Sequence, residues 1–264
     1  MRKRAWVKGA AWAWVGCLVL VALFAPTLAP FNPRLPVGEA LALPGGMTLL
    51  GTDTLGRDIL SRLIFGTRYS VGSTLLATGI TIMLGLCLSL WAAVGHRILD
   101  RILLGLANTG LAIPGLLLAM LLVAAVGPGL PTVVLAVGLG GAPGYFRLSR
   151  SILRGYMHEG YVDAARSMGA GRARIALYHL LPNAFPQLLA LSMTHYAWAF
   201  LGTTTLTFLG LAGDPALPEW GAMLNSARTY LVQFPLQALL PGLLISLTVL
   251  SFHQLGERTP LPAT

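Results

Sequence analysis

Long runs without charge dominate the pattern of hydrophobic and polar positions in this chain. Five stretches carry no Asp, Glu, Lys or Arg, and they cover residues 9–33, 69–96, 102–146, 175–213 and 229–256. A helix of about 20 apolar residues crosses the hydrocarbon core of a bilayer. The third stretch is long enough for two crossings, and the Gly- and Pro-rich segment 127–131 in its middle is typical of a tight turn. The pattern therefore predicts six spanning helices, at about 9–29, 70–95, 103–126, 131–147, 186–210 and 235–254.

Composition supports an all-α, polytopic membrane protein and excludes an ordinary water-soluble domain. Of the 264 residues, 55% are apolar and 10% are charged, whereas soluble domains carry about 25% charged residues. Cys17 and Cys87 both lie inside apolar runs, which favours small buried side chains over a disulfide or a thiolate metal site. The apolar run after the basic amino terminus is longer than that of a signal peptide and contains Pro26 and Pro30, so it predicts a first span.

The distribution of basic residues predicts the orientation in the membrane. With the amino terminus inside, the cytoplasmic segments hold 13 of the 18 basic residues but only four acidic ones, and the outer segments balance at five of each. Short cytoplasmic loops are enriched in Lys and Arg, so both termini are expected in the cytoplasm. The thirteen are Arg2, Lys3, Arg4, Lys8, Arg97, Arg101, Arg147, Arg150, Arg154, Arg166, Arg172, Arg174 and Arg258. This asymmetry explains the net charge of +9 without a nucleic-acid partner.

The same pattern divides the chain into four parts. Residues 1–30 form a cytoplasmic amino terminus and the first span, and residues 31–69 form an extracytoplasmic segment. Residues 70–256 form the membrane core, with a long cytoplasmic loop at 148–185, and residues 257–264 form a cytoplasmic tail.

The absence of charged residues from the middle of the predicted spans limits the possible functions. No predicted span has an acidic or basic residue at its middle, whereas ion-coupled carriers usually bind their driving ion there. His195 in the fifth span is the one strongly placed titratable residue, and it either bonds a neighbouring helix or lines a pathway. The chain has no phosphate-binding Gly-x-x-x-x-Gly-Lys-Ser/Thr loop and no catalytic constellation. We therefore expect a transport subunit rather than an enzyme, with any ATP hydrolysis on another chain.

The cytoplasmic loop is the richest local signal. Its residues fit two short helices, one beginning at Asp163 and the second ending at Pro182, with Gly169 and Gly171 supplying a positive-φ turn between them. The apolar residues Tyr161, Ala165 and Met168 recur at helical spacing and predict one face for docking into a partner's groove. A plain surface loop remains the alternative.

This loop resembles the EAA loop of ABC-importer permeases. The resemblance rests on Asp163-Ala164-Ala165, then Gly169 after three residues, then Leu181-Pro182. In that family the loop forms a coupling helix that docks onto an ATP-binding subunit, which implies a coupling role for these six residues. Asp163 stands where the family usually has Glu and His179 where it has an aliphatic residue, and the retained carboxylate is expected to preserve docking.

A second resemblance points to a subfamily. The segment 50–70 is similar to the outer-face segment of the second permease in dipeptide, oligopeptide and nickel importers, and segments 208–211 and 218–225 resemble the region after the fifth span in that subfamily. The resemblance implies an ABC type I importer fold in the bacterial inner membrane. It also implies three kinds of partner: a similar, non-identical permease, two ATP-binding subunits that hold ATP and Mg²⁺, and an extracytoplasmic solute-binding protein. No cofactor is expected in this chain.

The outer face offers candidate docking residues. Asp53, Arg57, Asp58 and Arg62 fall at helical spacing and predict a short interfacial helix, which is either a solvated salt-bridged face or a rim for the binding protein. Glu219 and Trp220 are further rim candidates by their position after the fifth span, although Trp220 also suits an interfacial anchor.

The substrate is left open between peptides and nickel or metal chelates. His195, Met193 and Thr203 are the pathway candidates, all in the fifth span. Peptide members of the family often carry a carboxylate near the position of Thr203, and this chain has Gly202-Thr203-Thr204-Thr205 instead. A carrier or channel that works without an ATPase is the alternative function, and a membrane scaffold is a third.

Overall fold

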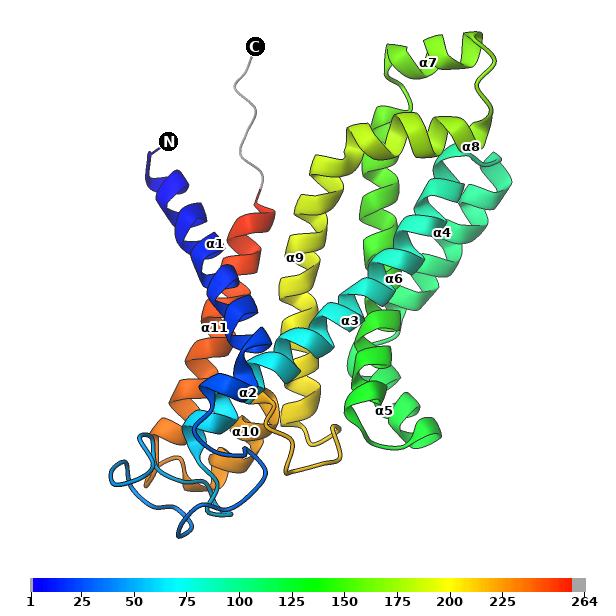
Figure 1. The fold of residues 1–264 in the computed structure, drawn as a ribbon. Coiled ribbons are helices and arrows are strands. Elements are labelled where there is room, and N and C mark those ends of the chain that lie inside the picture. Colours follow the sequence, from blue (N-terminus) through cyan, green and yellow to red (C-terminus); the bar gives the residue numbers. More distant parts are fainter. Residues whose placement is uncertain (1, 258–264) are drawn as a thin grey trace.

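A computed structural model describes residues 2–257, which form helices joined by loops. Six long helical segments make the body (Figure 1): α1 (Arg2–Leu23), α3 (Ile59–Val94), α4 (Arg97–Ala112) with α5 (Gly115–Val126), α6 (Leu130–Tyr156), α9 (Leu181–Phe208) and α11 (Leu236–Gly256). Shorter elements are α2 (Ala25–Leu28), α7 (Gly160–Ser167), α8 (Arg172–Arg174), the π-helical turn η1 (Ile175–Leu180), α10 (Trp220–Ala227) and the 3₁₀ turn η2 (Arg228–Tyr230).

Each of the six long segments overlaps one of the six predicted spans, with different ends. By length and composition alone, α1, α3 and α11 qualify as membrane crossings among the described residues, and the bent pair α4–α5 counts as a fourth. Helices α6 and α9 are 27 and 28 residues long, which is also enough to cross a bilayer. The turn predicted between the third and fourth spans is confirmed, because α5 ends at Val126 and Gly127 adopts a φ of +96°.

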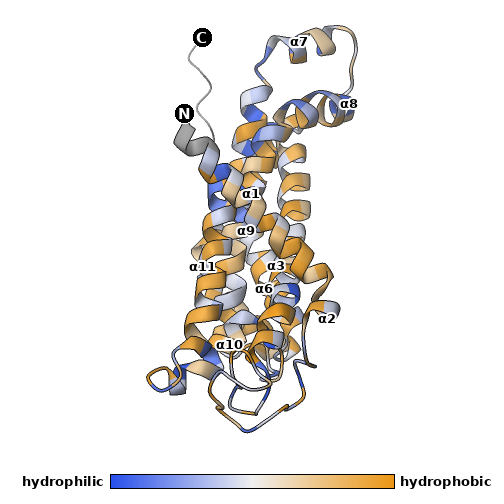
Figure 2. Ribbon diagram, turned by 60° about the vertical axis from the view of Figure 1, so that its left-hand side comes forward, coloured by the Kyte–Doolittle hydropathy of each residue, from blue (hydrophilic) through white to orange (hydrophobic). Residues whose placement is uncertain are grey.

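The ends of the bundle differ in character. The start of α1, the end of α11 and α7 lie at one end, and the loop of residues 31–58 and α10 lie at the other (Figure 1). Lys8 Nζ donates to the Glu257 carbonyl over 3.0 Å, which holds α1 beside α11. Hydrophobic residues cover the middle of the long helices, and hydrophilic residues gather at α7 and α8 (Figure 2). Apart from Glu257, the predicted tail lies outside the described residues.

Helix α3 corrects the prediction of a short interfacial helix. Residues 53–58 form a loop, and a single helix of 36 residues begins directly after them at Ile59. The Asp58 carboxylate caps its start, accepting hydrogen bonds from Ser61 N at 2.7 Å and Ser61 Oγ at 2.6 Å. A helix of this length measures about 54 Å, so it crosses the bundle diagonally and reaches beyond a bilayer core (Figure 1).

The third predicted span is broken. Helices α4 and α5 meet at an angle of 85°, with Ile113 in an extended conformation at φ −83° and ψ 119°. Pro114 explains the break, because a proline ring disfavours the helical conformation of the residue before it and has no N–H to donate. The prediction of one continuous helix over 103–126 is therefore wrong at this point.

An ion-paired cluster fixes the start of α4 against α6. Asp100 is buried, and Arg150 Nη2 and Arg154 Nη2 donate to its Oδ2 over 2.7 and 2.6 Å. Arg150 bonds both carboxylate oxygens, which is the geometry that makes such pairs strong. These two arginines belong to the last turns of α6, just before the chain enters α7.

Candidate functional site

Helix α7 projects from one end of the bundle on two connecting segments (Figure 1). Val162 and Ala165 are buried, and Val162 packs with Leu153, Ile175 and Leu180 of neighbouring elements. Asp163 and Ala164 lie exposed on the other side, and Asp163 pairs with Arg166 over 3.1 Å. One side of α7 is therefore packed against the bundle, and the opposite side is exposed.

The prediction of an apolar docking face on α7 is wrong about which residues face outward. Met168 is 81% exposed and Tyr161 is half-buried against the bundle, so they do not share one outward face with the buried Ala165. Tyr161 and Val162 pack against the bundle instead, and Met168 does not. The outward surface is formed by the polar and small residues that include Asp163 and Ala164.

One of the two predicted glycine turns is confirmed. Gly169 has a φ of +84°, and the N–H of Ala170 donates to the Ala165 carbonyl over 3.0 Å to close the end of α7. Gly171 has a φ of −70° and therefore does not supply a left-handed residue.

Pro182 does not end the second helix of this loop. Helix α8, the turn η1 and α9 follow one another without a gap, and Leu181 and Pro182 form the first turn of α9. In η1 the N–H of Leu181 donates to the Ala176 carbonyl, five residues back. This wider turn directly precedes Pro182, and a local π turn is one way in which a continuous helix accommodates a proline that has no N–H to donate.

The charged residues predicted for the outer face form a buried network. Arg57 Nε donates to Asp53 Oδ2 over 2.7 Å, and Arg62 Nε lies 3.3 Å from the same oxygen. Arg62 also donates to the carbonyls of Pro33 and Ala216 over 3.1 Å and to that of Leu217 over 3.3 Å. One guanidinium therefore ties the loop before α3 to the loop after α9.

Glu219 and Trp220 extend this network to α10. Glu219 accepts from Ser70 Oγ over 2.8 Å and from the N–H of Ala222 over 2.9 Å, which caps α10. Its complete burial raises the pKa of its carboxyl group. Trp220 Nε1 donates to the Leu63 carbonyl over 3.1 Å, and its ring covers Gly66, where a Cβ would come within 2.5 Å of it.

All six residues predicted as a docking rim are buried in this chain. Their exposed fractions run from 0% for Glu219 and Trp220 to 8% for Asp53. They therefore do not present side chains to a partner, because they bond within the loop of residues 31–58 or pack against α3 and the segment after α9. Binding of a solute receptor to this face stays a prediction. Leu43, Met47 and Leu55 are exposed neighbours of the six buried residues.

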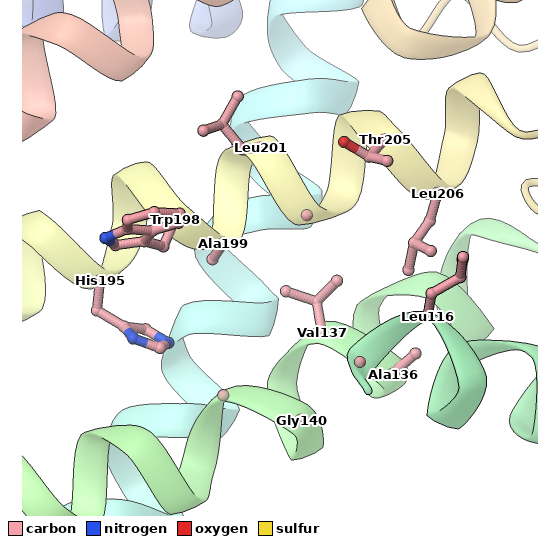
Figure 3. A pocket seen from close by; sticks show the side chains of 13 residues that line it. Leu116, Ala136, Val137, Gly140, His195, Trp198, Ala199, Leu201, Thr205 and Leu206 are labelled. Atoms are coloured by element: carbon pink, nitrogen blue, oxygen red, sulfur yellow. The ribbon is translucent and has the colours of Figure 1, made fainter. Parts of the chain in front are cut away.

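A cavity of about 540 Å³ opens between α5, α6 and α9 (Figure 3). Its wall is mostly apolar and includes four glycines, and His195 is the one titratable residue that lines it within the described part of the chain. The lining residues are Gly115, Leu116, Ala136, Val137, Gly140, Gly141, His195, Trp198, Ala199, Leu201, Gly202, Thr205 and Leu206.

Of the three predicted pathway residues, only His195 lines this cavity. Its ring packs edge-on against Tyr145 with centroids 5.6 Å apart, and its buried Nε2 has no hydrogen-bond partner among the described residues. Thr203 is 1% exposed and bonds Thr74 of α3 over 2.8 Å, so it belongs to a contact between helices. Met193 is half-buried and does not line the cavity.

The sequence did not predict the cavity residues on α5 and α6. They come from segments far apart in the chain, and none carries a charge or a motif. The glycines Gly140 and Gly202 are the one signal that the wall offers, because glycine in a spanning helix marks a close approach or an open space.

Comparison with known proteins identifies the family. Residues 85–257 match the family model described as the binding-protein-dependent transport system inner membrane component. This chain belongs to that family.

Three relatives in this permease family are similar over most of their length. The di/tripeptide transport system permease protein DppC of Pseudomonas aeruginosa is 39% identical over 91% of this chain and 82% of its own. The glutathione transport system permease protein GsiD of Pectobacterium atrosepticum is 36% identical, over 94% of this chain and 83% of its own. The dipeptide transport system permease protein DppC of Haemophilus influenzae is 36% identical, over 91% and 84%.

Solved structures confirm the fold. Two structures of inward-facing conformations of the MetNI methionine ABC transporter match with TM-scores of 0.62 and 0.59, at 18% and 19% identity. Each match covers 75% of this chain and 96% of the solved chain. The fold is therefore that of an ABC importer permease, an inner-membrane transport subunit, and the family implies ATP-binding subunits and a binding protein as partners.

Proposed function

We propose that this chain forms one half of the membrane pathway of an ATP-driven importer of short peptides, paired with a similar but non-identical permease. Helix α7 would dock onto an ATP-binding subunit, and the opposite end would receive the solute-binding protein. The observation that carries this proposal is a permease fold whose one projecting helix resembles the coupling motif of the family. Movement of the ATP-binding subunits would then reach the spanning helices through α7.

Peptides are the substrate class that the relatives favour. The three relatives described above are named for di- and tripeptides, dipeptides and glutathione, which is itself a tripeptide. We therefore place peptides before nickel and metal chelates. The family assignment likewise favours an importer over a carrier, channel or scaffold.

ATP and Mg²⁺ would bind the partner subunits, because this chain has no phosphate-binding loop. The basic end of the bundle, which includes α7 and α8, would face the cytoplasm. Both termini would then lie inside the cell, and the loop of residues 31–58 would lie outside.

The two loop glycines allow a matched test of the coupling role. A Cβ at Gly169 or at Gly171 meets nothing within 4 Å, but only Gly169 requires a positive φ. Gly169→Val is therefore expected to distort the end of α7 at a cost of about 1–2 kcal/mol, while Gly171→Val keeps its geometry. The measurement is peptide uptake and ATP hydrolysis by the complete complex in proteoliposomes.

We expect Gly169→Val to lower uptake per ATP hydrolysed, with Gly171→Val close to the wild type. Equal coupling in the two variants, with the complex intact in both, would count against α7 as the coupling element. Absence of any ATP-dependent peptide uptake by the wild-type complex would count against the importer itself.

A further inference from the structure

The cavity between α5, α6 and α9 borders the broken span. Gly115 and Leu116 form part of its wall, and they directly follow the non-helical residues Ile113 and Pro114. Inside a bilayer, non-helical backbone is tolerated where protein covers it or where it lines a water-filled space, because lipid tails offer no hydrogen bonds. The position of the break therefore favours an aqueous pathway or a protein neighbour on this side of the bundle over lipid.

The chemistry of the wall selects what can enter. The wall carries aliphatic residues, Trp198 and glycine backbone, and its polar side chains are His195 and Thr205. A charged group brought here would lose hydration without meeting an opposite charge on this chain, which is costly. An apolar group would gain by leaving water. The wall therefore favours an apolar occupant.

The size of the cavity fits more than one side chain. Its volume of about 540 Å³ lies within the range of small-molecule sites. Gly140 of α6 and Gly202 of α9 leave parts of the wall without side chains. His195 lies at one end of the lining segment of α9 and Leu206 at the other (Figure 3). A bulky side chain together with the adjoining peptide backbone suits this space, with the hydroxyl of Thr205 available as a hydrogen-bonding group.

We propose that the cavity between α5, α6 and α9 is the part of the translocation pathway that accepts bulky apolar side chains of the transported peptide, and thereby limits the size and charge of the cargo. The proposal rests on the proposed function, because it assigns a pocket within a peptide pathway. It locates part of the selectivity in the permease, in addition to that of the binding protein.

Glycine substitutions test the size limit with a matched control. A Cβ on Gly202 would lie 3.5 Å from Val137 Cγ2, an ordinary contact, so the rest of a leucine side chain at this position would enter the cavity. Gly79 on α3 also lies in a spanning helix, and a Cβ there meets nothing within 4 Å. The variants are Gly202→Leu and Gly79→Leu, in the complete complex with binding protein and ATP-binding subunits.

Uptake of dialanine, dileucine and dilysine into proteoliposomes is measured for each variant relative to the wild type. Comparing each peptide with itself cancels the preference of the binding protein. We expect Gly202→Leu to lower dileucine uptake about tenfold while dialanine uptake is retained, and Gly79→Leu to leave both unchanged.

The charge limit has its own pair of variants at Thr205, which lines the cavity with an exposed side chain. Thr205→Asp introduces a carboxylate. Thr205→Asn introduces a side chain of nearly the same shape as aspartate but without the charge. We expect Thr205→Asp to raise the uptake of dilysine relative to dileucine, because the carboxylate offers the missing opposite charge. Thr205→Asn should leave this ratio at the wild-type value.

Three results would overturn the proposal while leaving peptide import intact. Equal loss of all peptides in Gly202→Leu, together with loss of the second permease from the complex, would show that a partner helix fills the cavity. Unchanged uptake of every peptide by Gly202→Leu would show that the cargo does not enter the cavity. The same conclusion would follow if the ratio of dilysine to dileucine uptake were equal in Thr205→Asp and Thr205→Asn. If the wild-type complex imports none of the three peptides although its binding protein holds them, the proposed function fails first.

Discussion

At the scale of single residues, buried charge organises the end of the molecule that holds the loop of residues 31–58. Arg62 is 2% exposed, and its guanidinium donates to three backbone carbonyls from two separate loops while facing Asp53. Arginine suits this role because its planar group carries five donors in a fixed arrangement. The loops before α3 and after α9 therefore depend on one side chain for part of their hydrogen bonding.

Replacement of Arg62 by Met should be strongly destabilising. It leaves the Asp53 carboxylate and three carbonyls without this donor in a buried site, and removal of one partner from such a pair costs about 3–5 kcal/mol. Arg68, two turns later on α3, is exposed, so Arg68→Met should stay within about 0.5 kcal/mol of the wild type. Thermal unfolding of the purified protein in detergent measures both, and equal midpoints would contradict the assigned role of Arg62.

At the scale of elements, the crossing of α3 and α6 is the most extensive helix contact in the bundle. The helices approach closely at Gly85, where an added Cβ would lie 2.8 Å from Tyr145 Cδ1 and 3.0 Å from the Phe146 backbone nitrogen. Gly138 on α6 plays the matching part, with a Cβ 3.0 Å from the Ala77 carbonyl oxygen. Small residues at such crossings allow two backbones to pack directly.

Adding one methyl group at this crossing should separate the two helices. Gly85→Ala places its Cβ against buried groups that have no room to move, and overpacking of this kind costs about 1–3 kcal/mol. Gly79→Ala, on the same helix with open space, should gain up to about 1 kcal/mol from the lower backbone entropy of alanine. The two melting temperatures should therefore shift in opposite directions, and a shared shift would argue against a tight crossing at Gly85.

The sequence predicted the presence of the elements better than their continuity. Charge-free runs located the six spans because a bilayer excludes charge over a fixed length. The break at Pro114 lies within one such run. Because hydropathy does not distinguish a broken helix from a straight one, the charge-free run did not predict the break. The opposite error occurred at Pro182, where the pattern predicts the end of a helix although the proline occupies the first turn of α9.

At the scale of the whole molecule, the distribution of charge separates the two ends. The exposed arginines Arg166, Arg172 and Arg174 lie around α7 and α8, whereas Arg57 and Arg62 at the other end are buried with Asp53. Charge counts along the sequence predicted which segments share a side. They did not predict burial of Asp53, Arg57 and Arg62, because that depends on how residues 31–58 fold against the start of α3.

Cysteine labelling should show the orientation directly. Leu43 lies exposed in the loop of residues 31–58 and Ser167 lies exposed at the end of α7. In a background with Cys17 and Cys87 replaced by alanine, a membrane-impermeant maleimide added to intact cells without an outer membrane should label Leu43→Cys only. Ser167→Cys should react only after the membrane is opened. The reverse pattern would place α7 outside and exclude contact with ATP-binding subunits.

The π-helical turn η1 takes up one extra residue between α8 and α9. A π turn holds one residue more than an α turn within about the same rotation, whereas one residue added to a regular α-helix turns everything beyond it by about 100°. Removing one residue from Ile175–Leu180 should therefore let this turn close as an α turn, with His195 and Gly202 still facing the cavity. The turn thus protects the side of α9 that faces the cavity from a change of one residue in the chain that leads out of α7.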